Sequence, residues 1–290
     1  MSTVGESFLV GLIGEGVIPS LTPALHEREA DHHGLRYLYR PIDLTVIDRP
    51  ATDVGVLLHQ ACDLGFNACN VTHPCKQEVL AHLDEISAGA AAIGAVNTVL
   101  MTDGQLIGAN TDATGFATGL RTGLPEADIS FVVLLGAGGA GAAVGHALLA
   151  AGVKRLVIVD LDRSRAIDRA ASLLARYPDA AVMADSPDAL VRLLPQATGL
   201  VNATFVGMHS HPGLPVRAEL LRPDLWVADI VYRPLITELV AAATALGAPI
   251  LDGGHMAIGQ AADTFRLITG LDPDAARMRA HFLELIEDGC

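Results

Sequence analysis

One short segment carries an amide, a hydroxyl and an ammonium group, which suit ligand binding and proton transfer. Asn70, Thr72 and Lys76 follow an apolar run in the segment Asn70-Val-Thr-His-Pro-Cys-Lys76. An ammonium group can release and regain a proton, whereas the guanidinium group of arginine cannot do so at ordinary pH. Only two of the 19 basic residues are lysines, which favours a proton-transfer role for Lys76. The second lysine, Lys154, stands beside Arg155 at a corner between a helix and a strand, where chance explains it.

Two further polar residues stand at the ends of predicted elements. Asn97 lies in the sequence Gly-Ala-Val-Asn-Thr, and Asp112 lies in Asn-Thr-Asp. Polar groups at strand ends and on loops are where rigid scaffolds carry their sites. Taken singly, Asn70, Thr72 and Asp112 are explained equally well as helix caps.

A glycine turn between an apolar strand and an Ala/Leu-rich helix indicates a dinucleotide site. The strand is Phe131-Val-Val-Leu-Leu, and the turn follows it as Gly136-Ala-Gly138-Gly139-Ala-Gly141. Gly136 would permit the tight turn, and Gly138 would let the backbone approach a pyrophosphate. Gly139 or Gly141 would allow close packing of helix on strand, so that the helix N-terminus faces the phosphates.

An acid closes the next predicted strand, as this motif requires. Asp160 ends Leu156-Val-Ile-Val-Asp, where a carboxylate accepts hydrogen bonds from ribose hydroxyls and repels a 2'-phosphate. Asp162, Arg163 and Arg165 follow. An arginine here can stack on adenine, pair with Asp160 or bind a 2'-phosphate, and alternatively Asp162 caps a helix whose arginines are solvated. We expect NAD as the cofactor.

The elements that position these residues form two units. The first, from about Phe8 to Ile107, mixes strands and helices, and the turn Asp103-Gly104 predicts a hairpin. Its predicted strands are 8–13, 37–42, 66–71, 96–101 and 105–108. A first helix starts at Thr22-Pro23 with a hydroxyl cap, and two more span 53–64 and 74–83. The second, from near Asn110, alternates helices at 114–122, 139–151 and 163–176 with strands at 131–135, 155–160, 181, 200 and 226.

Such alternation predicts a parallel sheet covered on both faces. Two final helices, 257–269 and 273–287, can return to pack on the first unit. We therefore predict an α/β protein with a mixed α/β substrate-binding and catalytic domain (1–109 with 255–290). The other domain (110–254) is predicted to be a Rossmann-type, doubly wound, parallel-sheet domain that binds NAD.

Composition excludes several classes of partner. A formal net charge of -14 argues against nucleic acid as a partner, because proteins bind its phosphates with clustered Lys and Arg.

The sequence also bears on where the protein is found. The first 27 residues hold no Lys or Arg, so the positively charged first part of a secretory signal is not expected. The uncharged stretch 129–153 is interrupted by the glycine turn and is no membrane span. Four cysteines, Cys62, Cys69, Cys75 and Cys290, match no secreted scaffold. We expect a cytoplasmic protein, a monomer or a homodimer.

Taken together, the motifs resemble the shikimate and quinate dehydrogenase family, and the resemblance spans nearly the whole chain. Seven of them occur in the family's order: Ser20-Leu-Thr22, Asn70 to Lys76, Gly94 to Thr98, Asn110 to Asp112, Gly136 to Gly139, Asn202-Ala-Thr204 and Gln260. Seven ordered matches are far more specific than any one of them.

The resemblance implies that Lys76 and Asp112 form a catalytic pair. Lys76 would exchange a proton with a ring hydroxyl of quinate or shikimate while hydride passes to NAD, and Asp112 would orient it. Ser20 and Thr22 would bind the substrate carboxylate. The other implied substrate-binding residues are Asn70, Thr72, Asn97, Tyr232 and Gln260. The implied cofactor-binding residues are Gly136, Ala137, Gly138, Gly139, Ala140, Asp160, Arg163, Arg165, Asn202, Ala203, Thr204, Met208, Val231 and Gly254.

Departures from the family pattern narrow the expectation. Thr22 replaces the serine of many shikimate-specific members, and Asp160-Leu-Asp replaces an Asn-Arg-Thr-like segment of the NADP-dependent branch. Both favour the catabolic, NAD-dependent quinate/shikimate branch. Phe205 stands where proline is usual, and Gly253-Gly-His-Met256 replaces Gly-x-Gly-Met, so local loops should differ.

Other readings stay open. They are an NADP-preferring biosynthetic shikimate dehydrogenase, an aminoshikimate or aminoquinate dehydrogenase, and a cofactor-binding regulator without turnover. Cys69, His73 and Cys75 suggest a metal site, but Pro74 separates them and no second cluster completes four ligands, so we expect no metal.

Overall fold

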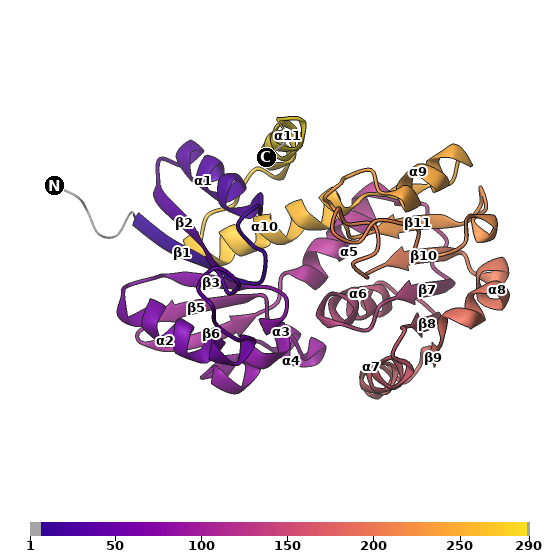
Figure 1. The fold of residues 1–290 in the computed structure, drawn as a ribbon, viewed down its shortest axis with the longest axis horizontal. Coiled ribbons are helices and arrows are strands. Elements are labelled where there is room, and N and C mark those ends of the chain that lie inside the picture. The colour runs from indigo at the N-terminus through magenta and orange to yellow at the C-terminus, as the bar shows by residue number, and fades with distance from the viewer. Residues whose placement is uncertain (1–6, 289–290) are drawn as a thin grey trace. The chain divides into compact units, whose positions relative to one another are not determined.

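The computed structural model describes residues 7–288, so Cys290 and the outer ends of the predicted N-terminal domain lie outside it. The described chain divides into two compact units, coloured along the sequence in Figure 1. The first unit combines the chain up to Thr111 with the chain from Gln260 onward, and the second comprises Asp112–Gly259.

The first unit is built on a mixed six-stranded sheet with the order β2-β1-β3-β5-β6-β4. Strands β2, β1 and β3 are parallel, whereas β5 is antiparallel to both β3 and β6. The strands are β1 (Ser7–Gly14), β2 (Arg36–Asp43), β3 (Ala68–Val71), β4 (Glu85–Ile86), β5 (Thr98–Thr102) and β6 (Gln105–Ala109). The helices are α1 (Thr22–His32), α2 (Val54–Asp63), α3 (Cys75–Glu78), α4 (Ala88–Ile93), α10 (Gly253–Thr269, which begins in the second unit) and α11 (Ala275–Glu287).

Both faces of this sheet are buried, because its strands alternate apolar residues between two cores. Ile13, Val71 and Val99 point to the face covered by α2. Val10 and Phe265 belong to the core on the opposite face, beneath α1 and α10. The ends of the parallel strands are therefore fixed from both sides, which is what a site built there requires.

The second unit is a doubly wound parallel sheet. Its strand order is β12-β11-β10-β7-β8-β9. If β7 to β12 are renumbered 1 to 6 and the sheet is read from β9, this is the order 3-2-1-4-5-6 of Rossmann folds. The strands are β7 (Phe131–Leu135), β8 (Arg155–Val159), β9 (Ala181–Asp185), β10 (Gly199–Asn202), β11 (Trp226–Asp229) and β12 (Ile250–Leu251). The helices are α5 (Asp112–Gly123), α6 (Gly139–Ala150), α7 (Arg163–Arg176), α8 (Leu190–Leu193) and α9 (Glu238–Ala245). The predicted α/β fold with a Rossmann-type unit is confirmed.

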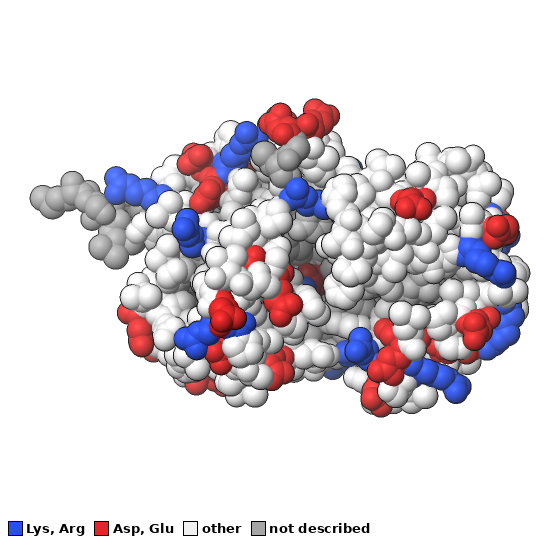
Figure 2. All heavy atoms as spheres, viewed as in Figure 1, with Lys and Arg blue, Asp and Glu red and all other residues white. Residues whose placement is uncertain are grey.

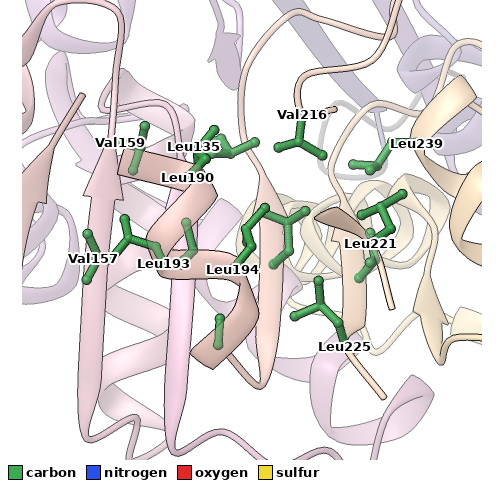
Figure 3. Packing of buried hydrophobic residues seen from close by; sticks show 14 of the residues in the cluster. Leu135, Val157, Val159, Leu190, Leu193, Leu194, Val216, Leu221, Leu225 and Leu239 are labelled. Atoms are coloured by element: carbon green, nitrogen blue, oxygen red, sulfur yellow. The ribbon is translucent and has the colours of Figure 1, made fainter. Parts of the chain in front are cut away.

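Successive residues of the central strands supply the two cores of this unit. Leu135, Val157 and Val159 pack against Leu193 and Leu194 on one face, as Figure 3 shows. A continuous apolar strand is typical of a parallel sheet that is buried on both faces. This burial anchors β7, whose carboxyl end carries the glycine turn.

Several local predictions are corrected by the structure. Helix α1 has Leu21 as its N-cap and no side-chain cap, so Thr22 does not serve the capping role predicted for it. The helix predicted at 74–83 is split into α3 and a 3-10 turn at Val79–His82. The hairpin prediction is confirmed, because Asp103 and Gly104 have φ values of 52° and 79° between β5 and β6.

A buried ion pair fastens the last helix to the first. The Glu29 side chain has no exposed surface, and it accepts hydrogen bonds from Arg277 Nε at 2.9 Å and the Asp274 backbone N–H at 2.8 Å. Burial alone would raise the pKa of Glu29, but the hydrogen bonds from Arg277 and Asp274 outweigh it and lower the pKa below 4.5. The pair therefore stabilises the fold fully above about pH 4.5, the pKa of an unfolded glutamate. This stabilisation is lost as the pH falls through the lower pKa of Glu29 in the folded protein.

We expect Glu29→Gln to lower the free energy of unfolding by about 2 kcal/mol at pH 7, because the buried carboxylate loses its charge-assisted bonds to Arg277, which is partly exposed and keeps Asp274 as a charged partner. The difference from wild type should shrink at acid pH, and urea unfolding at both pH values measures it. The control is Glu284→Gln, whose exposed pair with Arg28 should contribute less than about 1 kcal/mol. Equal losses in the two variants would contradict this account.

The surface is acidic overall, with a net charge of -14. On the face drawn in Figure 2, Asp and Glu are interspersed with Lys and Arg. Within residues 7–288, no helix combines the length and apolar character needed to cross a membrane.

Candidate active site

The carboxyl ends of β1 and β3 hold two of the predicted substrate segments side by side. The Thr72 N–H donates to the Ile13 carbonyl at 2.9 Å, and the Glu15 N–H donates to the His73 carbonyl at 3.0 Å. Gly14 is required at this point, because a Cβ there would overlap the Thr72 side chain. The loop that leads from β1 to Ser20 is thus bonded to the segment that leads from β3 to Lys76.

Asp43, at the end of β2, fixes the same loop and was missed from sequence. Its carboxylate accepts hydrogen bonds from the N–H groups of Gly16 at 3.0 Å and Ile18 at 3.2 Å. Burial would raise the pKa of Asp43, but these bonds and those from Thr45 lower it, so the group is ionised at neutral pH. An acid that ends a predicted strand was the available signal. Ser20 follows on this loop, and its hydroxyl accepts the Thr22 N–H at 3.3 Å.

Asn70 and Asn97 meet in a buried polar network. The Asn70 amide donates to the Asn97 carbonyl at 3.0 Å and to the Thr98 hydroxyl at 2.9 Å. The Asn97 amide donates to the Thr111 hydroxyl at 2.8 Å, and this hydroxyl lies 2.9 Å from that of Thr264 on α10. The alternative that Asn70 and Thr72 cap the next helix is wrong, because the N-cap of α3 is Pro74 without a side-chain bond.

Lys76 lies on α3 beside this network. Its carbonyl accepts the Val96 N–H at 2.9 Å, directly before Asn97. Its side chain is half-buried, as is that of Thr72. The structure therefore groups Thr72, Lys76 and Asn97 in the first unit, while Gln260 lies on α10 and opens the second segment of that unit.

Asp112 is the first residue of α5 and is 5% exposed. By chain division it belongs to the second unit, whereas Lys76 belongs to the first. Their pairing stays a prediction.

The glycine turn after β7 has the shape that a pyrophosphate site needs. Gly136 has a φ of 96°, and a Cβ there would lie 2.7 Å from the Ala203 carbonyl oxygen. Gly141 shows close packing, because its Cβ would overlap the Gly136 carbonyl. A Cβ at Gly138 would meet nothing within 4 Å, which leaves the N-terminus of α6 open to a ligand phosphate. The turn fits a dinucleotide.

Asp160 directly follows β8 and is tied to this turn. Its carboxylate accepts the Ala137 N–H at 2.7 Å and the Asp162 N–H at 2.9 Å. Asp162 caps α7 by accepting the N–H groups of Ser164 and Arg165, as the capping alternative predicted. Arg163 and Arg165 are exposed on the first turn of α7. A carboxylate is therefore fixed beside the glycine turn with two cations on the neighbouring helix.

The loop after β10 is organised by buried side chains. Asn202 has no exposed surface, and its amide donates to the Val206 carbonyl and the Asp229 carboxylate, both at 3.0 Å. Its oxygen accepts the N–H and hydroxyl of Thr204. Asn202 thus shapes the loop that also carries Ala203, Thr204 and Met208, and the contacts of these residues with a cofactor stay predictions.

Asp229, at the end of β11, joins this loop to the next and was also missed from sequence. Besides Asn202, it accepts the Val231 N–H at 3.0 Å and the Thr237 hydroxyl at 2.7 Å. Burial raises the pKa of Asp229, and these hydrogen bonds offset the effect only in part. The Val231 carbonyl packs so closely on Gly253 that a Cβ there would overlap it, which places Val231 next to the start of α10 and Gly254. Tyr232 follows, half-buried.

We expect Asp229→Ala to destabilise the protein by about 3 kcal/mol and to weaken NAD binding, because three buried donors lose their acceptor. Thermal unfolding and a fluorescence titration with NAD measure the two effects. Asp229→Asn keeps the shape and one acceptor oxygen, so it should lose less. Unchanged NAD affinity in a folded Asp229→Ala protein would show that the two loops do not depend on this carboxylate.

Burial keeps two thiols of the predicted cysteine and histidine segment protonated. It raises the pKa of Cys69 to about 12 and that of Cys75 to about 11. Within residues 7–288, no group of three or more His, Cys, Asp or Glu side chains is arranged to hold a metal ion.

Comparison with known proteins decides the family. A protein of Arthrobacter sp. named shikimate dehydrogenase (NADP(+)) is 58% identical over 99% of this chain and 98% of its own length. The chain belongs to the shikimate dehydrogenase family. Residues 12–99 also match the family described as shikimate dehydrogenase substrate binding domain.

Two further relatives bear on the cofactor. A quinate dehydrogenase of Corynebacterium glutamicum, solved in complex with NAD, is 46% identical, with a TM-score of 0.90 over 96% of this chain and 99% of that one. A shikimate 5-dehydrogenase of Thermus thermophilus, solved with NADP(H) and shikimate, is 34% identical, with a TM-score of 0.83 over the same shares. Family members of both coenzyme types thus share this fold, and the coenzyme must be argued from the site.

Proposed function

We propose that this member of the shikimate dehydrogenase family is an NAD-dependent oxidoreductase that acts on a ring hydroxyl of quinate, shikimate or both. The observation that carries the coenzyme assignment is the Asp160 carboxylate, held 2.7 Å from the Ala137 N–H of the glycine turn. A fixed negative charge at the end of β8 favours ribose hydroxyls and repels a 2'-phosphate.

The opposing observation comes from the relatives and from α7. Two relatives at 58% identity carry NADP(+) in their names, whereas three relatives named as NAD(+) enzymes are 46% to 48% identical. Arg163 and Arg165 lie beside Asp160 and suit a phosphate. An NADP-preferring shikimate dehydrogenase is therefore the second candidate. We favour NAD, because two backbone N–H groups hold the Asp160 carboxylate beside the glycine turn, where its negative charge would repel a 2'-phosphate, whereas Arg163 and Arg165 are exposed.

In the proposed mechanism, Ser20 and Thr22 bind the substrate carboxylate through neutral hydroxyls. The residues that bind its ring hydroxyls are Asn70, Thr72, Asn97 and Gln260. Lys76 accepts the proton of the reacting hydroxyl during oxidation and returns it during reduction. Asp112 orients Lys76 and compensates its charge. A bound nicotinamide coenzyme supplies the hydride acceptor.

This assignment gives each of the two units a separate binding role. We propose that the first unit binds the substrate and supplies Lys76, and that Asp112–Gly259 binds the dinucleotide at the ends of β7, β8 and β10, where the strand order reverses.

Steady-state rates with NAD and NADP, each paired with quinate and with shikimate, test the proposal. The expected result is a kcat/KM for NAD well above that for NADP. A preference for NADP with shikimate would replace our assignment by the second candidate. Turnover only with amino-substituted analogues would indicate an aminoshikimate or aminoquinate dehydrogenase. No turnover with any pair, despite coenzyme binding, would favour a regulator.

A further inference from the structure

The orientation of the Asn70 side chain is fully determined. Its two amide hydrogens point at the Asn97 carbonyl and the Thr98 hydroxyl. A flipped amide would set its oxygen against the Asn97 carbonyl oxygen, which cannot donate, so the flip is excluded. Asn70 is 5% exposed, so little of this amide reaches a ligand. The only group left for a substrate is its oxygen, which can accept from a substrate O–H.

That oxygen is held by Tyr39. The Tyr39 hydroxyl donates to Asn70 Oδ1 at 2.5 Å, and both residues are buried. Sheet register explains how they meet. Tyr39 on β2 pairs with Val10 of β1, and Asn70 on β3 pairs with Leu12. Alternate β1 residues face the same side, so the tyrosine ring reaches over β1 to the amide.

The tyrosine is itself rigid. Its ring packs edge-on against His26, with centroids 5.2 Å apart and an interplanar angle of 62°, inside the core that includes Val10 and Phe265. Burial lowers the pKa of His26 to about 3, so the packing partner is a neutral ring at physiological pH. The Tyr39 hydroxyl therefore donates to Asn70 from a ring that is packed within this core.

We propose that Tyr39 is a positioning residue for substrate binding, which fixes the Asn70 amide so that its oxygen accepts a substrate hydroxyl. The inference rests on the proposed function, because only that function makes Asn70 a binding residue for a ring hydroxyl of the substrate. Without the Tyr39 hydroxyl the two bonds from the amide nitrogen still exclude the flip, but the oxygen loses its buried donor and is held less firmly for a substrate hydroxyl.

The chain offers a matched control on the same strand. Tyr37 lies two residues away, on the same face of the sheet, and is 6% exposed against 5% for Tyr39. Its hydroxyl lies 3.1 Å from His26 Nδ1 and has no bond to Asn70. Tyr37→Phe and Tyr39→Phe therefore remove equivalent buried hydroxyls, but only one of them contacts Asn70.

The test compares steady-state kinetics of the two variants. Tyr39→Phe should raise the KM for quinate or shikimate about fivefold to tenfold, the range expected for one lost hydrogen bond, with kcat and the KM for NAD within about twofold of wild type. Tyr37→Phe should leave all three constants unchanged, even where both variants lose similar thermal stability. In an Asn70→Ala background, Tyr39→Phe should add no further change in KM, because the partner is gone.

Three results would overturn the inference: an unchanged substrate KM in a folded Tyr39→Phe enzyme, an equal rise in Tyr37→Phe, or an undiminished effect in the Asn70→Ala background. Calorimetric titrations with quinate and shikimate distinguish failure of the inference about Tyr39 from failure of the proposed function. A wild-type protein that binds either compound without turnover would end the proposed function, and the dissociation constants of the two variants would still decide the role of Tyr39.

Discussion

Lys76→Ala should lower kcat by about 10²- to 10⁴-fold, the usual contribution of a positioned general acid or base. Alanine cannot accept the proton of the reacting hydroxyl, so hydride can leave only from an alcohol that keeps its proton. NAD affinity should be unchanged, because the glycine turn and Asp160 lie in the second unit. Pre-steady-state rates and an NAD titration of the same preparation measure the two expectations.

The control for this variant is Lys154→Ala. Lys154 is the second lysine of the sequence. It is exposed in the loop between α6 and β8. Its removal takes away the same charge and should leave kcat within about twofold. A rate loss below tenfold in Lys76→Ala would remove the lysine from the proton-transfer step.

Asp160→Asn should shift the coenzyme preference toward NADP by about 100-fold in the ratio of kcat/KM values. The change removes the charge that repels the 2'-phosphate and leaves Arg163 and Arg165 to attract it. It should also weaken NAD binding, since asparagine has one acceptor oxygen for the two N–H groups, of Ala137 and Asp162, that now donate to the carboxylate. Rates with both coenzymes, measured at fixed ionic strength, give the ratio.

Asp162→Asn is the matched control. It removes the neighbouring acid, while asparagine keeps the capping bonds to Ser164 and Arg165. The coenzyme ratio should change by less than about threefold. A similar shift in both variants would mean that net charge around α7, rather than the fixed Asp160 carboxylate, sets the preference.

The central part of the fold could be predicted from sequence because its signals are local. The strand Phe131–Leu135 and the helix Arg163–Arg176 were predicted with the bounds that the structure shows, since an apolar run before a glycine turn and a capped amphipathic pattern each suffice. The hairpin at Asp103-Gly104 followed from the same kind of rule. Family membership followed from the order of seven motifs, which no single motif could establish.

The parts that were missed depend on long-range contacts. Helix α4 is only six residues long, and its composition of alanine and glycine carries no amphipathic pattern. Tyr39 and Asp229 form hydrogen bonds to residues on other strands, and Asp43 to the loop after β1, so these partners appear only when the fold is known. Asn202 illustrates the converse, because a motif residue expected beside the cofactor is fully buried.

The first unit is discontinuous in sequence, since its sheet comes from the chain before Asp112 and part of its covering from the chain after Gly259. On the ribosome, the complete second unit therefore emerges while the first still lacks Phe265 of its core. Until the last thirty or so residues are made, the apolar face beneath α1 stays open to water. Nascent chains that stall late in translation should then be the species that chaperones and proteases meet.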